Sequence, residues 1–313
     1  MNWKRKAKIQ SLIATLPSSL SYKVYYFIQR RFGAIRNPNP VSRLSAGVTI
    51  CDHICGQNQA IKHKTFLEIG TGRRLNVPIA LWLCGALKII TVDINPYLKP
   101  ELILKDISYI TENHQVVRRL FGGYSQEPLF QSRFDELLNA ELCMEHLLDM
   151  MNIQYLAPAD ARRLDLQTQS VDFHISCSVL EHIPPELIGD ILLEGKRVLK
   201  KKGLFLHSVD LSDHFSHSDS SISAIKFLQF SEGQWNHYAG NRYAYHNRLR
   251  VDDYVGLFHT VGLKILSSDT KIDQKALEEL KRGFPLHEHF KDKTAETNAT
   301  TYAFIVASLD QFT

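Results

Sequence analysis

A glycine turn after an apolar run is the first feature of this sequence that suggests chemistry. Residues 65–69 read "TFLEI" and are followed by Gly70, Thr71 and Gly72. Such a turn lets the backbone approach a ligand, and the next helix offers free N–H groups to it. A second apolar run ends at Asp93, about 20 residues further on, where a carboxylate can accept hydrogen bonds from both ribose hydroxyls. The spacing predicts a site for a nucleotide-like ligand.

Two arginines stand where a dinucleotide-binding fingerprint has its third glycine. They are Arg73 and Arg74. A glycine turn by itself is also consistent with close packing of a helix on a strand, so the turn alone does not select a ligand. For the arginines, the sequence leaves two interpretations open: contact with an anionic substrate, or exposure to solvent.

Apolar runs alternate with helical patterns from residue 65 onward. The helical pattern over 184–203 begins with proline, carries lysines near its end and stops at Gly203. Near-continuous apolar strands separated by helices predict an α/β fold with a mostly parallel sheet covered on both faces. The predicted strands are residues 65–69, 88–93, 153–156, 171–177, 203–209, 263–268 and 302–308.

Two regions are predicted, a basic helical N-terminal extension over 1–62 and a catalytic domain over 63–313. The domain contains helical inserts at about 95–152 and 272–300, which are longer than the alternation of strands and helices needs. One amphipathic helix is expected over 134–151, "FDELLNAELCMEHLLDMM". Long inserts of this kind are places where substrate specificity is built.

Further motifs follow the later strands in a fixed order. "APADARR" (157–163) comes after the third predicted strand, "SVLEHI" (178–183) after the fourth, and "RVLKKKGLFLHS" (197–208) leads into the fifth. Over residues 64–211 the series resembles the class I S-adenosylmethionine-dependent methyltransferases. The similarity is with the small-molecule branch, and in particular with bacterial members whose EIGTG turn lacks the third glycine.

The resemblance implies a Rossmann-like, doubly wound, seven-stranded sheet with an antiparallel C-terminal edge hairpin, and S-adenosyl-L-methionine as the cofactor. It implies that Glu68 receives the ammonium group, that Asp93 holds the ribose, and that Asp160 contacts the adenine amino group. Cys177 would lie near the sulfonium. The implied cofactor-binding residues are Glu68, Gly70, Thr71, Gly72, Asp93, Ile94, Asp160, Ala161, Cys177 and Ser178.

A hydroxyl acceptor would need a base, and histidine titrates in the right range. The candidate catalytic residues are His182, just after the fourth predicted strand, and His207, at the end of the fifth. The run "HSVDLSDHFSH" (207–217) contains five potential metal ligands. Because its spacing matches no specific template and polar loops are rich in such residues, no metal is predicted.

The acceptor is expected to be a small molecule, and its class is suggested by residues 226–250. Aromatic side chains alternate there with amides and arginines, a mixture that suits a sugar-like or anionic glycolipid acceptor through stacking and directed hydrogen bonds. The competing interpretation is that the aromatic side chains pack the following helix onto the sheet. The motif after the fourth predicted strand differs from those that stack a flipped base, so nucleic acid is not the favoured acceptor.

Charge is distributed unevenly along the chain. Although the net charge is +4, the nine lysines and arginines that precede Asp52 meet no acidic residue. A basic amphipathic start is compatible with peripheral contact with the inner face of an anionic membrane, with an anionic substrate, or with a solvated helix packed on the core. The five scattered cysteines and the lack of a 20-residue apolar stretch favour a cytoplasmic protein. The oligomeric state is not predicted.

Two other functions compete with small-molecule methyl transfer. A nicotinamide-dependent oxidoreductase would use Asp93, but it leaves Asp160 and "SVLEHI" unexplained and lacks the third glycine. A non-catalytic methyltransferase-like scaffold would keep the fold without turnover, although the cofactor positions are intact in this sequence.

Overall fold

The computed structural model describes residues 1–33, 35–36 and 39–309, so the last four residues of the predicted domain lie outside it. Two compact units divide the chain. The first, here the histidine unit, comprises Met1–Asn37, Ser178–Gly189 and Ser208–Ile305. The second, here the turn unit, comprises Pro38–Cys177, Asp190–His207 and Val306–Thr313. The predicted boundary at residue 62 stays a prediction.

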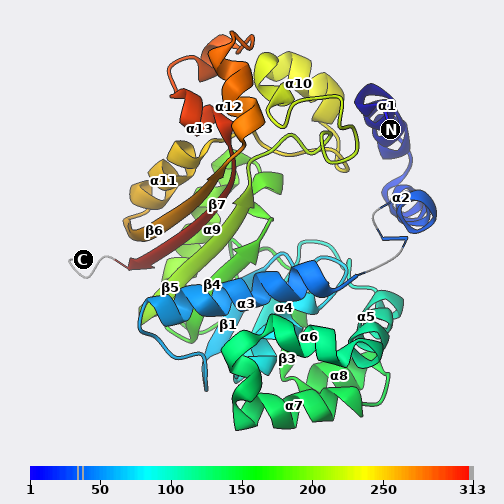
Figure 1. Cartoon of the computed structure of the whole chain (residues 1–313), viewed down its shortest axis with the longest axis vertical. Coiled ribbons are helices and arrows are strands. Elements are labelled where there is room, and N and C mark those ends of the chain that lie inside the picture. Colours follow the sequence, from blue (N-terminus) through cyan, green and yellow to red (C-terminus); the bar gives the residue numbers. More distant parts are fainter. Residues whose placement is uncertain (34, 37–38, 310–313) are drawn as a thin grey trace. The chain divides into compact units, whose positions relative to one another are not determined.

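The described residues form a seven-stranded mixed sheet, as the sequence predicts. Its strand order is β3-β2-β1-β4-β5-β7-β6, with an antiparallel edge at β5-β7-β6 (Figure 1). This is the doubly wound, Rossmann-like order with a C-terminal edge hairpin. The strands are β1 (Thr65–Ile69), β2 (Lys88–Val92), β3 (Ile153–Leu156), β4 (Val171–Cys177), β5 (Leu199–Asp210), β6 (Leu263–Ile272) and β7 (Thr300–Leu309).

Strand β1 lies between two parallel neighbours. Its Phe66 is in register with Ile89 of β2 and with Phe173 of β4. The three side chains are buried, as expected for parallel strands that are covered on both faces. The parallel arrangement brings the carboxyl ends of β1, β2 and β4 to one edge of the sheet, where ligands bind in open α/β folds.

The helices of the turn unit cover its strands. Figure 1 shows α3 beside α4, and α3 also contacts α6, while α4 contacts α7. Every residue of α4 is buried, which explains why its sequence is apolar all round. From α3 to β5 along the chain, the helices are α3 (Val41–Gly56), α4 (Asn76–Leu83), α5 (Pro100–Glu112), α6 (His114–Leu120), α7 (Pro128–Leu138), α8 (Met144–Met150) and α9 (Pro185–Val198), with the 3₁₀ turns η1 (Gly122–Gln126) and, in the histidine unit, η2 (Leu180–His182).

Two helices replace the single one predicted over 134–151. Helix α7 ends at Leu138 and α8 begins at Met144. At the break, the side chain of Asn139 donates to the carbonyl of Asp135 at 2.8 Å. Asparagine side chains that bond to nearby backbone compete with helix continuation, which apolar periodicity does not reveal.

Helix α9 also ends earlier than predicted, because the lysines after it enter strand β5. Asp172 of β4 accepts from Lys200 at 2.8 Å, from Lys64 at 3.1 Å and from the Thr65 N–H at 3.0 Å. A side chain at Gly203 would meet the Asp172 carbonyl at 2.6 Å. Gly203 therefore allows two strands to approach each other and does not end the helix.

The histidine unit has a core made largely of aromatic side chains. Trp3 lies 5.7 Å from Phe215 and 4.8 Å from Tyr238, measured between ring centroids. Trp235 and Phe227 are buried in the same cluster. Most aromatics of residues 226–250 are therefore packing residues. The other helices are α1 (Trp3–Ala14), α2 (Ser18–Phe32), α10 (Glu232–Ala239), α11 (Val251–Thr260), α12 (Gln274–Lys281) and α13 (Ala295–Ala299), with the 3₁₀ turns η3 (Lys226–Gln229) and η4 (Glu288–Phe290).

Helix α1 packs its apolar face on this core and directs its charges outward. Trp3, Ala7 and Ile13 are buried, whereas Lys4 and Lys8 are exposed. The helix contacts α10 and α2. Within residues 1–33, 35–36 and 39–309, no helix combines the length and the apolar character that crossing a bilayer requires.

Candidate functional site

The turn after β1 has the backbone conformation that its glycines predict. Gly70 and Gly72 have φ values of 85° and 67°, a region that glycine reaches without the steric cost a side chain brings. The Gly70 N–H donates to the carbonyl of Val92 at 2.7 Å and so continues the β1–β2 ladder. A Cβ at Gly72 would meet no atom within 4 Å. The turn is therefore fixed on one side and open on the other.

Glu68 is a buried carboxyl group beneath this turn. Its Oε2 accepts from the Thr91 hydroxyl at 2.5 Å, and Thr91 is 2.7 Å from the hydroxyl of Thr71. Burial raises the pKa of Glu68 to about 8, although the Thr91 hydroxyl and the charge of Arg43 both act to lower it. A carboxyl group in this state gains by meeting a cation, because a cation stabilises its charged form.

Arg43 is a site residue that the sequence analysis does not single out. It lies in α3, and its guanidinium donates to the Cys177 carbonyl at 3.1 Å and contacts the Cys177 sulfur at 3.2 Å. The same guanidinium acts electrostatically on Glu68. In the sequence Arg43 is one basic residue among nine in the N-terminal region, and no local motif marks it. Its role depends on α3 packing in the turn unit.

Asp93 directly follows β2 and lies beside the glycine turn. Its Oδ2 accepts from the Gly72 N–H at 2.9 Å and its Oδ1 from the Asn95 N–H at 3.0 Å. Burial raises its pKa, and these two backbone hydrogen bonds oppose that rise. Each carboxylate oxygen has a second lone pair for a ligand hydroxyl. The neighbouring Ile94 is 65% exposed, so its apolar side chain can cover a ligand.

Asp160 follows β3 and is engaged by a nearby arginine. Its carboxylate accepts from the Arg162 N–H at 2.9 Å and from the Arg162 guanidinium at 2.7 Å. These hydrogen bonds lower the pKa of Asp160, so the carboxylate is charged at neutral pH. The side chain is 39% exposed, and Ala161 beside it is half-buried. An adenine amino group would share Asp160 with Arg162.

Cys177 is the last residue of strand β4, and Ser178 follows it. Cys177 is half-buried and holds Arg43 through its carbonyl and sulfur. Ser178 has a φ of 55° and its N–H donates to the Ser208 carbonyl at 3.0 Å. A residue other than glycine with positive φ is uncommon, and here the hydrogen bond to Ser208 holds the conformation.

The two arginines after the glycine turn have separate partners. Arg74 donates through Nε to Asp106 of α5 at 2.6 Å and makes a second contact through its terminal nitrogen. The Asp106 side chain is fully buried. The guanidinium of Arg73 lies 5.9 Å from the ring centroid of Tyr97. Arg74 is therefore neither a solvated side chain nor a substrate ligand, because it joins the turn to α5.

His207 is a core residue of the turn unit. Its Nδ1 lies 2.7 Å from the Ser176 hydroxyl and its Nε2 lies 3.1 Å from Nδ1 of His174. Burial, and then the neighbouring His174, bring its pKa well below the usual histidine value. A ring that is fully buried, with both nitrogens engaged, favours packing over proton exchange with an acceptor.

His182 is exposed on the 3₁₀ turn η2 of the histidine unit. Its Nδ1–H donates to the carbonyl of Tyr245 at 2.9 Å. Its ring centroid lies 5.0 Å from that of His214. Of the two histidines singled out in the sequence, His182 is the one at the surface.

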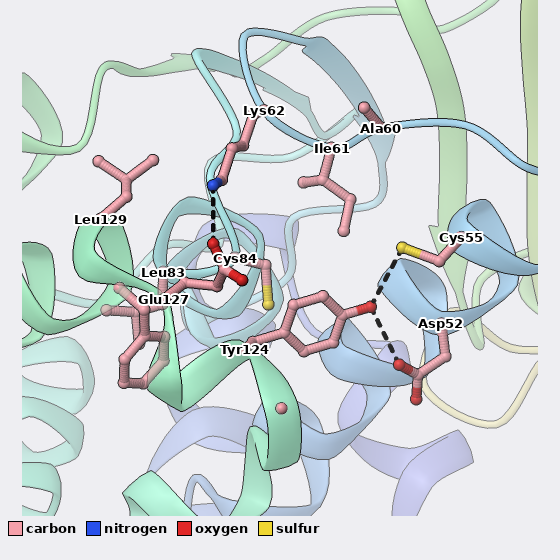
Figure 2. A pocket seen from close by; sticks show the side chains of 12 residues that line it. Asp52, Cys55, Ala60, Ile61, Lys62, Leu83, Cys84, Tyr124, Glu127 and Leu129 are labelled. Carbon is pink, nitrogen blue, oxygen red and sulfur yellow. Dashed lines mark hydrogen bonds and ion pairs between the residues drawn. The ribbon is translucent and has the colours of Figure 1, made fainter.

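One cavity in the turn unit contains none of the predicted site residues. It has a volume of about 580 Å³ and is bounded by α3, α4 and the segment that contains η1. Figure 2 shows Tyr124 pointing toward Asp52 and Cys55, with hydrogen bonds of 3.0 and 3.4 Å, and Lys62 paired with Glu127 at 2.8 Å. This cavity is distinct from the residues that surround the glycine turn.

Comparison with known proteins gives a match over one part of the chain. Residues 132–207 match the family model of a methyltransferase domain, a stretch that contains Asp160, Cys177 and His182 but not the glycine turn. No curated protein matches the sequence.

Solved structures resemble this chain at low sequence identity. A S-adenosylmethionine-dependent methyltransferase from Methanosarcina mazei has a TM-score of 0.46 and 15% identity, with 82% of this chain and 98% of that chain covered. Magnesium protoporphyrin IX methyltransferase from Synechocystis, with bound S-adenosylhomocysteine, has a TM-score of 0.43 and 12% identity, with coverages of 86% and 84%.

Proposed function

We infer that this chain, which carries a S-adenosylmethionine-dependent methyltransferase domain, transfers a methyl group to a hydroxyl of a small molecule. The observation that carries the proposal is the set of charged groups around the glycine turn. A buried Glu68, an adjacent Arg43 and a backbone-held Asp93 belong to one unit. They offer an anion for an ammonium, a cation for a carboxylate and an acceptor for ribose hydroxyls.

Each end of the cofactor would find a complementary group. Glu68 would receive the ammonium and Arg43 the carboxylate of the methionine part. Asp93 would accept from the ribose hydroxyls through the lone pairs that Gly72 and Asn95 leave. Asp160 would meet the adenine amino group. The buried carboxyl of Glu68, whose pKa is raised, fits a cationic ligand better than it fits a pyrophosphate, which would be repelled by its charged form.

The bound cofactor supplies an electrophilic methyl group on a sulfonium. In the transfer the sulfur–carbon bond breaks as an oxygen–carbon bond forms, and the acceptor hydroxyl loses its proton to a base or to water. The residues of the chain contribute mainly by holding the two reactants in line, which can supply much of the rate enhancement of such a displacement.

The acceptor is proposed to be a sugar, a glycolipid or a secondary metabolite. Some aromatic residues that suggested this class cannot contact a ligand, because Phe227 and Trp235 are buried in the aromatic core. Two residues of the same segment remain, the half-buried Tyr245 and the exposed Arg242. These can still stack on a ring and bind an anionic group.

Calorimetric titration with S-adenosylhomocysteine tests the cofactor assignment. Wild-type protein should bind it, and Asp93→Ala should bind it about 100-fold more weakly, because two hydroxyl groups lose a charged acceptor. The control is Asp165→Ala, which removes an exposed carboxylate of the same unit and should leave the affinity unchanged. Binding of NADH but not of S-adenosylhomocysteine would favour an oxidoreductase instead.

Peripheral contact with an anionic membrane is proposed for helix α2. Helix α2 exposes Phe27 (64%) and Phe32 (76%) beside Arg30 and Arg31. Exposed aromatic side chains next to cations suit an anionic lipid surface. Sedimentation with vesicles that contain phosphatidylserine should fall for the Phe27→Ser, Phe32→Ser double variant. Equal sedimentation of both proteins would contradict the proposal.

A further inference from the structure

Three potential metal ligands converge in the histidine unit. They are Glu181 and His182 of η2 and His214, which follows strand β5. One ligand atom from each lies within 4.8 Å of the others. Two imidazoles and one carboxylate are a donor set that zinc and other divalent transition metals accept, with an open position for a water or substrate oxygen.

The turn that carries two of these ligands is held in place by Asn247. The Asn247 side chain donates to the carbonyls of Leu180 and Ile183, each at 2.9 Å. Its N–H donates to the carbonyl of Glu181 at 2.7 Å, and its own side-chain oxygen accepts from Tyr254 at 3.0 Å. These hydrogen bonds fix the backbone from which Glu181 and His182 project.

Each histidine is oriented in the way that metal ligation requires. The Nδ1–H of His182 donates to the Tyr245 carbonyl, which leaves the lone pair on Nε2. Metal-binding histidines commonly donate their other ring N–H to a carbonyl in this manner. Nε2 of His214 is buried and makes no hydrogen bond within the described part of the chain. The His214 ring stacks on His246, with 4.3 Å between centroids and 14° between planes.

A second carboxylate borders the cluster. Oδ2 of Asp210 lies 3.6 Å from Nε2 of His214 and 3.5 Å from Nε2 of His217. Oδ1 of Asp210 accepts from the N–H and the hydroxyl of Ser212 at 2.9 and 2.6 Å. Asp210 is therefore placed to complete a coordination shell.

We propose that Glu181, His182 and His214 bind one divalent transition-metal ion, with Zn²⁺ the preferred ion and an open position for an oxygen ligand. Ligand bonds of roughly 2.0–2.1 Å place tetrahedral ligand atoms about 3.4 Å apart. The three ligand atoms lie within 4.8 Å of one another, so small side-chain movements would bring them to that spacing. In this role His182 is a ligand and does not act as a base.

The proposal departs from the expectation that this chain holds no metal. That expectation concerned the run from 207 to 217, of which only His214 belongs to the three ligands. Glu181 and His182 come from the earlier motif "SVLEHI". His182 precedes His214 by 32 residues. Metal binding does not depend on the proposed methyl transfer, so the two can fail separately.

Metal content and a cobalt spectrum test the site. Protein purified without a histidine tag, incubated with ZnCl₂ and dialysed, should retain about one zinc per chain by mass spectrometry. Loading with Co²⁺ should give the intense visible absorption of a low-symmetry site with nitrogen ligands. His182→Ala, which changes an exposed side chain, and Glu181→Gln should each weaken zinc binding about 100-fold.

The matched control is His237→Ala, an exposed histidine of the same unit outside the cluster. This variant should retain zinc and the cobalt spectrum, and circular dichroism should show that every variant is folded. Absence of stoichiometric zinc from folded wild-type protein would overturn the proposal. Equal zinc affinity in wild type, His182→Ala and Glu181→Gln would also overturn it.

Discussion

The turn after β1 and the turn after β4 both follow buried parallel strands, but they are built differently. The first is held mainly by its own glycines and by residues of the adjacent strand β2 and its end, Val92 and Asp93. The second is held by Asn247, more than 60 residues away along the chain. The first turn is thus determined by a short motif, and the second by a long loop that returns to it.

This difference in how the two turns are held explains which functional site can be predicted from the sequence. A glycine turn followed by an acid at fixed spacing can be recognised because the same residues make the contacts. A cluster such as Glu181, His182 and His214 depends on where the chain after β5 returns. The sequence shows that the residues of the second cluster are polar. It does not show that their ligand atoms lie within 4.8 Å of one another in the folded chain.

The largest predicted effect concerns the buried pair that joins the first turn to α5. Asp106→Asn leaves the Arg74 guanidinium without its charged partner and should lower the free energy of unfolding by about 3–5 kcal/mol. Urea denaturation measures this. The control is Asp135→Asn, which breaks the exposed pair of Asp135 with Arg118 and should cause little change. Equal effects of the two changes would mean that Arg74 does not anchor the turn.

The second prediction separates the two turns by ligand. Asp93→Ala should weaken binding of S-adenosylhomocysteine about 100-fold while zinc binding is unchanged, because Asp93 belongs to the first turn only. Titrations with each ligand on the same preparation provide the measurement. If Asp93→Ala also weakened zinc binding, the variant would disturb the whole chain, and the two turns would not be independent.

The third prediction concerns a change in the second turn that should affect zinc binding only, with a smaller loss of affinity. Asn247→Ala should weaken zinc binding about 10- to 100-fold by freeing η2, with S-adenosylhomocysteine affinity retained. Asn241→Ala is the matched control, since Asn241 caps a different loop of the same unit by accepting from Tyr243 and Ala244. Thermal melting should confirm that both variants are folded. Unaltered zinc affinity in Asn247→Ala would contradict the role given to Asn247.

The last prediction is a pH dependence of cofactor affinity at Glu68. Its pKa of about 8 means that the free protein holds the carboxyl mainly protonated at neutral pH, whereas an ammonium ligand selects the charged form. Cofactor affinity should therefore rise with pH, by up to about tenfold per unit between about pH 5.5 and about pH 7.5. Calorimetry in buffers of different ionisation enthalpy should detect proton release. Glu68→Gln should abolish both signals, and a Glu68→Gln profile that matches wild type would exclude this group.

Much of the fold follows from the sequence. Strands β1, β3 and β4 have the predicted bounds, because apolar runs flanked by polar residues leave few alternatives for a buried parallel strand. The predicted helix bounds are wrong at two places. At Asn139 a side chain forms a hydrogen bond with the backbone, and at Gly203 two strands approach each other closely. These contacts join residues whose partners a linear pattern does not identify.

The candidate site divides in the same way. The structure brings together Glu68 of β1, Gly72 of the turn after it and Asp93, which directly follows the adjacent strand β2. Arg43 could not be predicted, because its position depends on how α3 packs. The aromatic segment shows the opposite failure, since residues such as Trp235 looked suited to a ligand but are needed to fill a core around Trp3.

Methyl transfer itself is the central claim, and isotope transfer tests it most directly. A cell extract incubated with the protein and S-adenosylmethionine carrying a labelled methyl group would be analysed by mass spectrometry. We predict label in a small molecule with wild-type protein and a loss of about 100-fold with Asp93→Ala at limiting cofactor. Binding of S-adenosylhomocysteine without any labelled product would contradict the claim and identify the chain as a non-catalytic cofactor-binding protein.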